Sequence, residues 1–321
     1  EGHTAHADEE GAWDETMTRL DQYERLYEEV MALPAMTGRK PDHDKFPGAH
    51  TTTTVEALMP DGKSVQGGTS HYLGTSFAEA FDLTYADAEE DEHVAHTTSW
   101  GLSWRARGAL IMVHSDDQGL VLPPTLAPEQ VVIVPIWQAD TKDEVLDYAE
   151  GVAQDLEAAA HRVHLDDREN RNPGFKYNEW ELKGVPLRIE VGPNEVEEGS
   201  ATLVHRPDGE SERVDRTGIA ATVDDHLDTV FAKLYASAEE TLEGEIREAE
   251  SREEILGTIG QHGGYVKSGW CGEEACEEPI KDAIAAEIVM VPLDRDAEPI
   301  HEDCAICGET AEETAYFAKS Y

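Results

Sequence analysis

Residues 97–136, TTSWGLSWRARGALIMVHSDDQGLVLPPTLAPEQVVIVPI, contain the boundary between two structural patterns. Before them, residues 51–74 (TTTTVEALMPDGKSVQGGTSHYLG) form two β-rich runs around Pro-Asp-Gly-Lys, which predicts a hairpin. Residues 108–115 (GALIMVHS) predict a third strand, and DDQG after them a turn. At the far end, residues 131–136 form a nearly continuous apolar run, as expected of a strand buried on both faces. We therefore expect an antiparallel sheet with helices, followed by a separate α/β domain.

The flanking segments extend both patterns. Apolar residues at spacings of three and four predict a helix within residues 9–33. Beyond residue 136, strand and helix patterns alternate: helices at 141–162, 174–184 and 222–248, and strands at 162–166, 185–192 and 200–206. Such alternation is typical of an α/β domain with a largely parallel sheet.

The overall charge is extremely acidic. Lys and Arg total 25 against 69 Asp and Glu, so the formal net charge is −44, while 39% of residues are still hydrophobic. Periodic apolar segments make disorder the weaker interpretation, although high charge would ordinarily favour it. A folded protein adapted to high salt fits better, because at 1 M salt the Debye length is only about 3 Å. No signal peptide is visible and no apolar run is long enough to span a bilayer, so we expect a cytoplasmic protein that makes no membrane contact.

Three stretches of the chain are nearly neutral. Residues 38–75, 99–136 and 161–190 together carry a net charge of −1. Buried segments hold fewer charges in any protein, yet these stretches keep Arg and Lys that the rest of the chain mostly lacks. A protein that is acidic overall but binds a polyanion would keep such surfaces.

All four cysteines lie near the end of the chain, as C-x4-C (Cys271, Cys276) and C-x2-C (Cys304, Cys307). Two close pairs of thiolates match closed, tetrahedral zinc ligation, in which no position remains open for catalysis. Two disulfides or four free thiols are the alternatives. We expect a structural Zn²⁺ site.

The motif around Arg105 carries a family resemblance. SWGLSWR (99–105) followed by GLVLPP (119–124) resembles motif 3 of class II aminoacyl-tRNA synthetases, specifically the archaeal/eukaryotic type of prolyl-tRNA synthetase. Arg105 matches the arginine of that motif, which implies an ATP-binding and catalytic role. The chemistry is reasonable, because a guanidinium entering a helix from a turn can hold nucleotide phosphates. For Arg105 alone, a surface arginine would be the simpler interpretation, and it remains so for Arg107.

Residues 38–74 (GRKPDHDKFPGAHTTTTVEALMPDGKSVQGGTSHYLG) resemble the same family between motifs 2 and 3. The resemblance implies that ATP is bound by Glu1, Gln66, Thr69 and Arg105. It implies that proline is bound by His3, His71, Trp100 and Gly101. Gln and Thr can hydrogen-bond a nucleotide without adding charge. Ordinary roles, a satisfied strand histidine for His71 and core packing for Trp100, are the alternatives.

Residues 170–193 (NRNPGFKYNEWELKGVPLRIEVGP) resemble the family's anticodon-binding domain. The resemblance implies tRNA contacts by Arg168, Arg171, Lys176, Lys183 and Arg188. Phe175, Tyr177 and Trp180 could stack on unpaired anticodon bases. An amphipathic helix with a solvated charged face is the alternative. AYFAKSY (315–321) also matches the family, in which the last Tyr packs back towards the catalytic domain, a role for Tyr321.

The resemblance implies three domains: the end of an α+β class II antiparallel-sheet catalytic core (1–126), an α/β anticodon-binding domain (127–235) and a small zinc-containing α/β domain (236–321). It implies a proline–tRNA ligase activity, in which ATP and Mg²⁺ activate L-proline as prolyl-adenylate for transfer to the 3′ end of tRNA(Pro). A homodimer is also implied. No Ser-His-Asp or Cys-His arrangement is present, and none is required.

The resemblance covers nearly all 321 residues but not the whole enzyme. Motif 1, the proline-recognising loop and the first part of motif 2 with its arginine are absent from the chain, and EGHTAHADEE (1–10) resembles the last strand of motif 2 running into a helix. A non-catalytic tRNA-binding module or a truncated synthetase paralogue is therefore the alternative. A threonyl or glycyl enzyme is disfavoured by QGGTSHYLG (66–74) and by the four cysteines.

Overall fold

The computed structural model describes all 321 residues and divides into two compact units. The first contains Glu1–Glu29, Pro34–Ala109 and Glu239–Tyr321, and the second contains Val30–Leu33 and Leu110–Ala238. The N-terminal and C-terminal parts of the chain thus belong to the same unit. None of the helices has the length and apolar composition that a transmembrane span requires.

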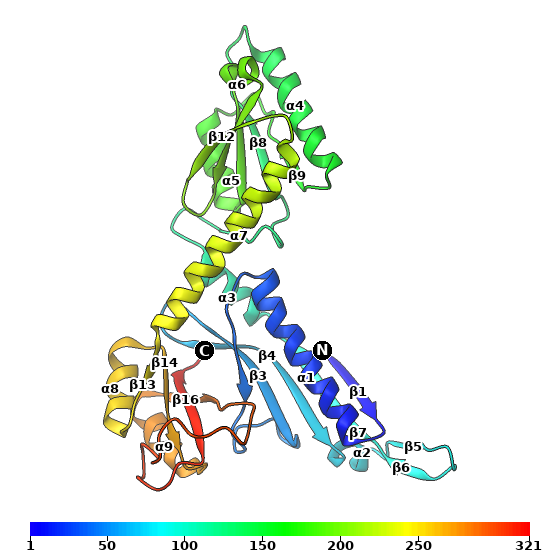
Figure 1. Cartoon of the computed structure of the whole chain (residues 1–321), viewed down its shortest axis with the longest axis vertical. Coiled ribbons are helices and arrows are strands. Elements are labelled where there is room, and N and C mark those ends of the chain that lie inside the picture. Colours follow the sequence, from blue (N-terminus) through cyan, green and yellow to red (C-terminus); the bar gives the residue numbers. More distant parts are fainter. The chain divides into compact units, whose positions relative to one another are not determined.

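An antiparallel sheet of five strands, in the order β1-β7-β4-β3-β2, forms the N-terminal part of the first unit (Figure 1). The strands are β1 (Gly2–His6), β2 (Met36–Arg39), β3 (Thr51–Leu58), β4 (Ser64–Gly74) and β7 (His96–Leu102). The hairpin of β3 and β4 confirms the prediction from the Pro-Asp-Gly-Lys turn. Every residue of β3 is buried, so this strand is covered on both faces. Helix α2 (Ser76–Ala80) and the small ribbon of β5 (Thr84–Ala86) and β6 (Glu92–Val94) connect β4 to β7.

Helix α1 (Glu9–Arg25) packs on this sheet and continues as a π-helical turn, η1 (Leu26–Val30). The Asp8 carboxylate caps its first turn by accepting from Gly11 N, and Glu9 and Glu10 complement the helix dipole there. The helix is joined to the sheet by Ser70 Oγ, which donates to Thr16 O at 2.8 Å. The predicted helix is confirmed.

The third strand expected over residues 108–115 is wrong, because this segment belongs to helix α3 (Arg105–His114). Its buried residues are Ala106, Ala109 and Leu110, at the spacings of three and four that one face of a helix requires. Strong helix formers at these positions outweigh the β-branched Ile111 and Val113. As a result, Arg105 stands at the beginning of a helix.

The second unit contains a five-stranded sheet in the order β12-β11-β10-β8-β9. Its strands are β8 (Val131–Pro135), β9 (Val163–Leu165), β10 (Leu187–Val191), β11 (Ser200–His205) and β12 (Ser211–Asp215). One face packs on α4 (Lys142–Ala158), α6 (Pro193–Glu198) and the beginning of α7 (Ile219–Gly244), and the other on α5 (Pro173–Lys183). Residues of β8 alternate between the two cores, and all five are buried as predicted.

This sheet is mixed rather than largely parallel, which corrects the prediction. Strands β8, β9 and β10 are parallel, but β11 and β12 are antiparallel to their neighbours. The connection from β10 to β11 contains only the six-residue helix α6, and a parallel crossover needs a dozen or more residues. The turn from β11 to β12 is a hairpin, which also imposes antiparallel pairing.

The C-terminal part of the first unit is a four-stranded sheet in the order β13-β14-β16-β15, with helices α8 (Arg252–His262) and α9 (Glu274–Ile284) packed on it. Its strands are β13 (Ile246–Glu248), β14 (Tyr265–Trp270), β15 (Ala286–Met290) and β16 (Glu313–Lys319). It lies beside the N-terminal sheet, because Arg39, at the end of β2, exchanges two backbone hydrogen bonds of 2.9 Å with Val291. Residues far apart in sequence can therefore line one cavity.

Candidate functional site

A cavity of about 320 Å³ lies in the first unit, between the N-terminal sheet and the C-terminal part of the chain. Its lining residues are Lys40, Asp44, Phe46, Thr52, Glu56, Gln66, Thr69, His71, Arg105, Glu287, Val289, Ser320 and Tyr321. Four of the residues that the resemblance assigns to ATP or proline (Gln66, Thr69, His71 and Arg105) are therefore brought together. Strand β4 supplies three of them, and the first residue of α3 supplies the fourth.

A β-bulge explains why Gln66, Thr69 and His71 line the same cavity. The register between β3 and β4 shifts so that Val55 faces Gly68 and Glu56 faces Gln66, which leaves Gly67 as the extra residue. A Cβ at Gly67 would lie 1.6 Å from Tyr27 Oη, so only glycine fits. The QGG motif therefore turns Gln66 to the face that Thr69 and His71 already share.

Both ring nitrogens of His71 meet threonine hydroxyls. Nδ1 lies 2.9 Å from Thr52 Oγ1, and Nε2 lies 3.0 Å from Thr69 Oγ1. Phe46 packs on the ring, with centroids 4.9 Å apart. Burial lowers the pKa of His71 to about 4, so the imidazole is neutral at physiological pH. It therefore acts as an oriented, uncharged hydrogen-bonding wall of the cavity.

Arg105 brings a positive charge to the cavity. Its Nε donates to Ser103 Oγ at 3.2 Å, and no carboxylate of the protein pairs with it. Most other arginines of the chain are held by carboxylates, for example Arg206 by Asp116 at 2.7 Å. A guanidinium that is left without a counter-charge in a cavity is suited to bind an anionic ligand.

Sequence reasoning missed several cavity residues, of which Glu56, Lys40 and Phe46 are the most informative. Glu56 is buried and accepts hydrogen bonds of 2.7 Å from Thr54 Oγ1 and Ser64 Oγ, and burial raises its pKa. A single glutamate in the otherwise uncharged run TTTTVEAL (residues 51–58) was a signal in the sequence, since a charge within a buried strand is rarely incidental. Lys40 and Phe46 had no comparable signal.

Tyr321 does pack against the N-terminal sheet. It lines the cavity, its hydroxyl donates to Asp61 Oδ2 at 2.7 Å, and Lys63 Nζ lies 4.3 Å from its ring centroid. Its backbone N–H donates to Ser64 O at 3.2 Å.

A second, more apolar cavity of about 440 Å³ adjoins Phe46. Its lining residues are His3, Thr4, Ala5, Phe46, Leu73, Phe77, Ala78, Phe81, Leu83, Thr97, Thr98 and Ser99. Phe46 is thus a wall common to both cavities, with His71 on one side and His3 on the other.

Trp100, Gly101 and Glu1 line neither cavity. Trp100 pairs with Gly2 across β1 and β7, and its ring lies 4.7 Å from the Arg19 guanidinium. Glu1 lies against Gly101, since a Cβ on Gly101 would come within 3.2 Å of Glu1 Cγ. These three residues therefore form a cluster of their own at the sheet edge.

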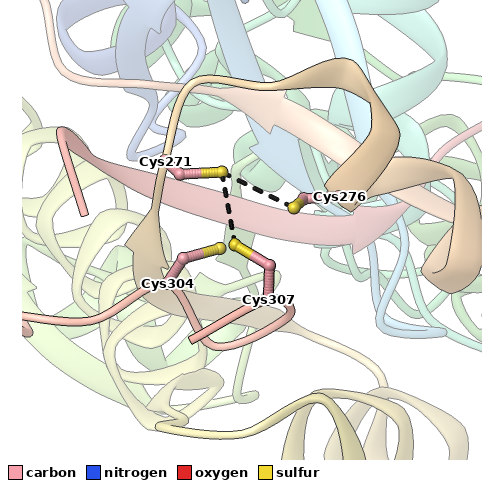
Figure 2. A group of neighbouring side chains, drawn as sticks. All are labelled: Cys271, Cys276, Cys304 and Cys307. Atoms are coloured by element: carbon pink, nitrogen blue, oxygen red, sulfur yellow. Dashed lines mark hydrogen bonds between the residues drawn. The ribbon is translucent and has the colours of Figure 1, made fainter. Parts of the chain in front are cut away.

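The four cysteines converge, as Figure 2 shows. Cys271 follows β14, Cys276 is on α9, and Cys304 and Cys307 are on the segment between β15 and β16. Their sulfur atoms all lie within 4.8 Å of one another, with 3.5 Å from Cys271 to Cys276 and 3.7 Å from Cys271 to Cys307. Four thiols at these separations fit one tetrahedral ion with metal–sulfur bonds of about 2.3 Å.

A second group of potential metal ligands, His205, Asp208 and Glu210, lies in the second unit. Both of its carboxylates already share one ammonium partner, because Lys233 Nζ donates to Asp208 at 2.6 Å and to Glu210. This group is therefore an ion-pair cluster within the protein surface.

The five predicted tRNA-binding cations lie on or near α5 and β10, in different surroundings. Arg168 pairs with Asp166 at 2.6 Å and with Glu179 at 2.8 Å, and Lys176 is buried with Nζ donating to Asp166 O at 2.7 Å.

The other three lie over aromatic rings. Lys183 lies over Trp180, Arg188 over Tyr177 and Arg171 over Phe175, at 4.0, 4.1 and 4.5 Å from the ring centroids. Lys183 and Arg188 also pair with carboxylates, whereas the exposed Arg171 has none. An exposed cation over an aromatic ring suits stacking on a nucleic-acid base.

Comparison with known proteins decides the family. An anticodon-binding domain model matches residues 130–226, and a model of the prolyl-tRNA synthetase C-terminal region matches residues 252–321. A proline–tRNA ligase of Haloquadratum walsbyi is 63% identical over the whole chain, which covers 68% of that protein. The chain belongs to the proline–tRNA ligase family. Similar proline–tRNA ligases of Haloarcula marismortui and Halorubrum lacusprofundi are 83% and 72% identical over the whole chain, which spans 66% of the length of each.

Family membership confirms the resemblance, and the organisms of the relatives bear on the acidic composition of the chain. These relatives come from haloarchaea, which fits the expectation of a protein adapted to high salt. The matched anticodon-binding region coincides with the mixed sheet and its helices in the second unit. The matched C-terminal region contains all four cysteines and Tyr321.

Proposed function

We propose that this chain is the part of a proline–tRNA ligase that holds ATP, part of the proline site and the anticodon-binding domain. The observation that carries the proposal is the convergence of Gln66, Thr69, His71 and Arg105 on one cavity, in a chain that belongs to this family. The reaction is ATP-dependent activation of L-proline and its transfer to the 3′ end of tRNA(Pro). It takes place in the cytoplasm, and the full-length protein acts as a homodimer.

Catalysis in this account depends on position and charge. Arg105 stabilises negative charge on the reacting phosphates, and Gln66 and Thr69 hydrogen-bond the nucleotide. When bound, Mg²⁺ would further neutralise the phosphates, and the carboxylates of Glu56 and Glu287 in the same cavity would offer the oxygen ligands that it prefers. No side chain has to act as a nucleophile.

The proline ring would occupy the boundary of the two cavities, against Phe46. The neutral His71 and the exposed His3 would flank it, and the apolar second cavity would exclude water. Trp100, Gly101 and Glu1 would support the site from the neighbouring edge of the sheet. This arrangement favours a small, apolar amino acid.

For tRNA, we propose that Arg171 makes the first contact, because its guanidinium is exposed and unpaired over Phe175. Lys183 and Arg188 would exchange their carboxylate partners for tRNA groups. Arg168 and the buried Lys176 would contribute by fixing the loop around Asp166, through which the other side chains are oriented.

Proline-dependent ATP–pyrophosphate exchange by the full-length protein tests the proposed activity. We expect exchange with proline and none with threonine or glycine, at molar salt. Exchange with threonine or glycine but not proline would contradict the substrate assignment. Binding of tRNA without any amino-acid-dependent exchange would instead support the non-catalytic module.

We further propose that the four cysteines hold one structural Zn²⁺ ion. The chain should contain one zinc per molecule, and Cys304→Ser should lose it and unfold the segment between β14 and β16, since structural zinc contributes roughly 10 kcal/mol to folding. Metal analysis and near-ultraviolet circular dichroism measure both effects, and Ala305→Ser in the same loop is the matched control. Zinc-free wild-type protein that is fully folded under reducing conditions would refute the site.

A further inference from the structure

The loop between β2 and β3, residues 40–50 (the cavity loop), supplies three of the residues that line the first cavity. These are Lys40, Asp44 and Phe46. Phe46 is the wall common to both cavities and packs on His71, so its position affects the whole proposed site. The contacts that hold the middle of this loop are therefore functionally important.

His43, in the middle of the cavity loop, is held from the C-terminal part of the chain. Its Nε2 donates to Glu277 Oε2, and its ring meets the edge of Trp270, with centroids 6.0 Å apart. Glu277 and Trp270 are only 5% and 2% exposed. The other oxygen of Glu277, Oε1, accepts from Ile288 N at 2.8 Å, so β15 fixes the orientation of the carboxylate.

Both partners of His43 are immediate neighbours of the cysteine cluster in sequence. Trp270 precedes Cys271, and Glu277 follows Cys276 at the beginning of α9. Trp270 Nε1 also donates to Glu273 O at 3.1 Å, within the turn that joins the two cysteines. An ion that holds the four thiols together therefore also fixes the two side chains that grip His43.

The beginning of the cavity loop has independent attachments. Lys40 Nζ donates to Val289 O at 3.1 Å, Lys40 N donates to Thr52 O at 2.8 Å, and Arg39 pairs with Val291 through the backbone. These contacts involve β15, Val291 and Thr52, and none of them involves His43, Glu277 or Trp270. Within the loop, Asp44 pairs with Lys40 at 2.9 Å and Phe46 N donates to Thr52 Oγ1 at 2.9 Å. Loss of the His43 contact should therefore loosen residues 42–48 without detaching them, and leave Arg39 and Lys40 in place.

We propose that His43 and Glu277 are positioning residues through which the four-cysteine centre keeps the cavity loop ordered. Phe46, on this loop, carries the effect to the substrate site. The coupling between the cavity loop and the cysteines does not depend on the proposed function, whereas the effect on substrates rests on it. By reciprocity, a change that loosens the cavity loop through His43 must also weaken metal binding at the cysteines.

The test measures both ends of this coupling in the zinc-loaded 321-residue chain at molar salt. His43→Ala should accelerate amide hydrogen exchange at residues 42–48 roughly tenfold, the size expected for loss of one buried charge-assisted hydrogen bond. It should leave the Lys40 amide unchanged. The same variant should lower zinc affinity, measured by competition with a chelator, by a similar factor.

The controls are matched within the chain. Glu278→Gln removes a carboxylate from an exposed position of α9, next to Glu277. It should change neither amide exchange at residues 42–48 nor zinc affinity. His43→Gln keeps a donor for Glu277 and should recover part of both effects. Glu277→Gln combined with His43→Ala should be no worse than His43→Ala alone, because the two residues act as one unit.

Unchanged exchange at residues 42–48, or unchanged zinc affinity, in His43→Ala would overturn the proposal. In the full-length enzyme, the same variant should lower kcat/KM for proline roughly tenfold, by the same loss of one buried hydrogen bond. If the wild-type enzyme is inactive but His43→Ala shows both structural effects, the proposed function is contradicted and the coupling is supported. An active wild-type enzyme with neither effect would contradict the coupling alone.

Discussion

Arg105→Ala is expected to lower proline-dependent ATP–pyrophosphate exchange by the full-length protein about 10²–10³-fold, the usual effect of removing one group that stabilises transition-state charge. Arg105 is the first residue of α3 and lines the cavity without a carboxylate partner, so its charge is free for phosphate. Because that charge acts in the transition state, kcat should fall more than the KM for ATP rises.

Arg107→Ala is the matched control, two residues further along α3. Arg107 is exposed, lies 5.7 Å from the centroid of Trp104, and is not among the cavity residues. We expect near wild-type exchange from it. Equal losses in both variants would show that α3 as a whole, and not the Arg105 guanidinium, supports the reaction.

Lowering the salt concentration should unfold the protein. The Debye length grows from about 3 Å at 1 M to about 10 Å at 0.1 M, so carboxylates that were screened from one another begin to repel. With 69 acidic and 25 basic residues, the chain cannot neutralise this repulsion internally, and many of its cations already sit in ion pairs. Circular dichroism during dialysis from molar KCl to about 0.1 M should show loss of secondary structure.

Sucrose is the control, because it favours compact states without screening charge. It should restore the fold much less than KCl does. A protein that keeps its circular dichroism spectrum and melting temperature at about 0.1 M salt would show that the acidity is not needed for stability at high salt.

Local patterns predicted much of this structure. The helix of α1, the β3–β4 hairpin, the buried strand β8 and the four-cysteine cluster all follow from spacing, turn residues and apolar runs. The segment of α3 was misassigned because a short apolar run fits strand and helix alike, and its position before a turn did not separate them.

The remaining features depend on long-range packing. Lys40 and Phe46 have ordinary local surroundings in the sequence, and they become site residues only because the cavity loop lies beside β4 and β15. The grip of Glu277 on His43 joins residues 234 positions apart, which no periodicity can indicate. For the cations of α5, the sequence predicted a charged surface, but only packing reveals that Lys176 is buried and Arg171 is free.

The most direct test of the central claim is aminoacylation by the full-length protein at molar KCl, with labelled proline and tRNA transcripts. We expect proline to be attached to a tRNA that carries a proline anticodon, and exchange of that anticodon for a threonine anticodon to abolish charging. Absence of proline charging, or charging of another amino acid in its place, would contradict the account.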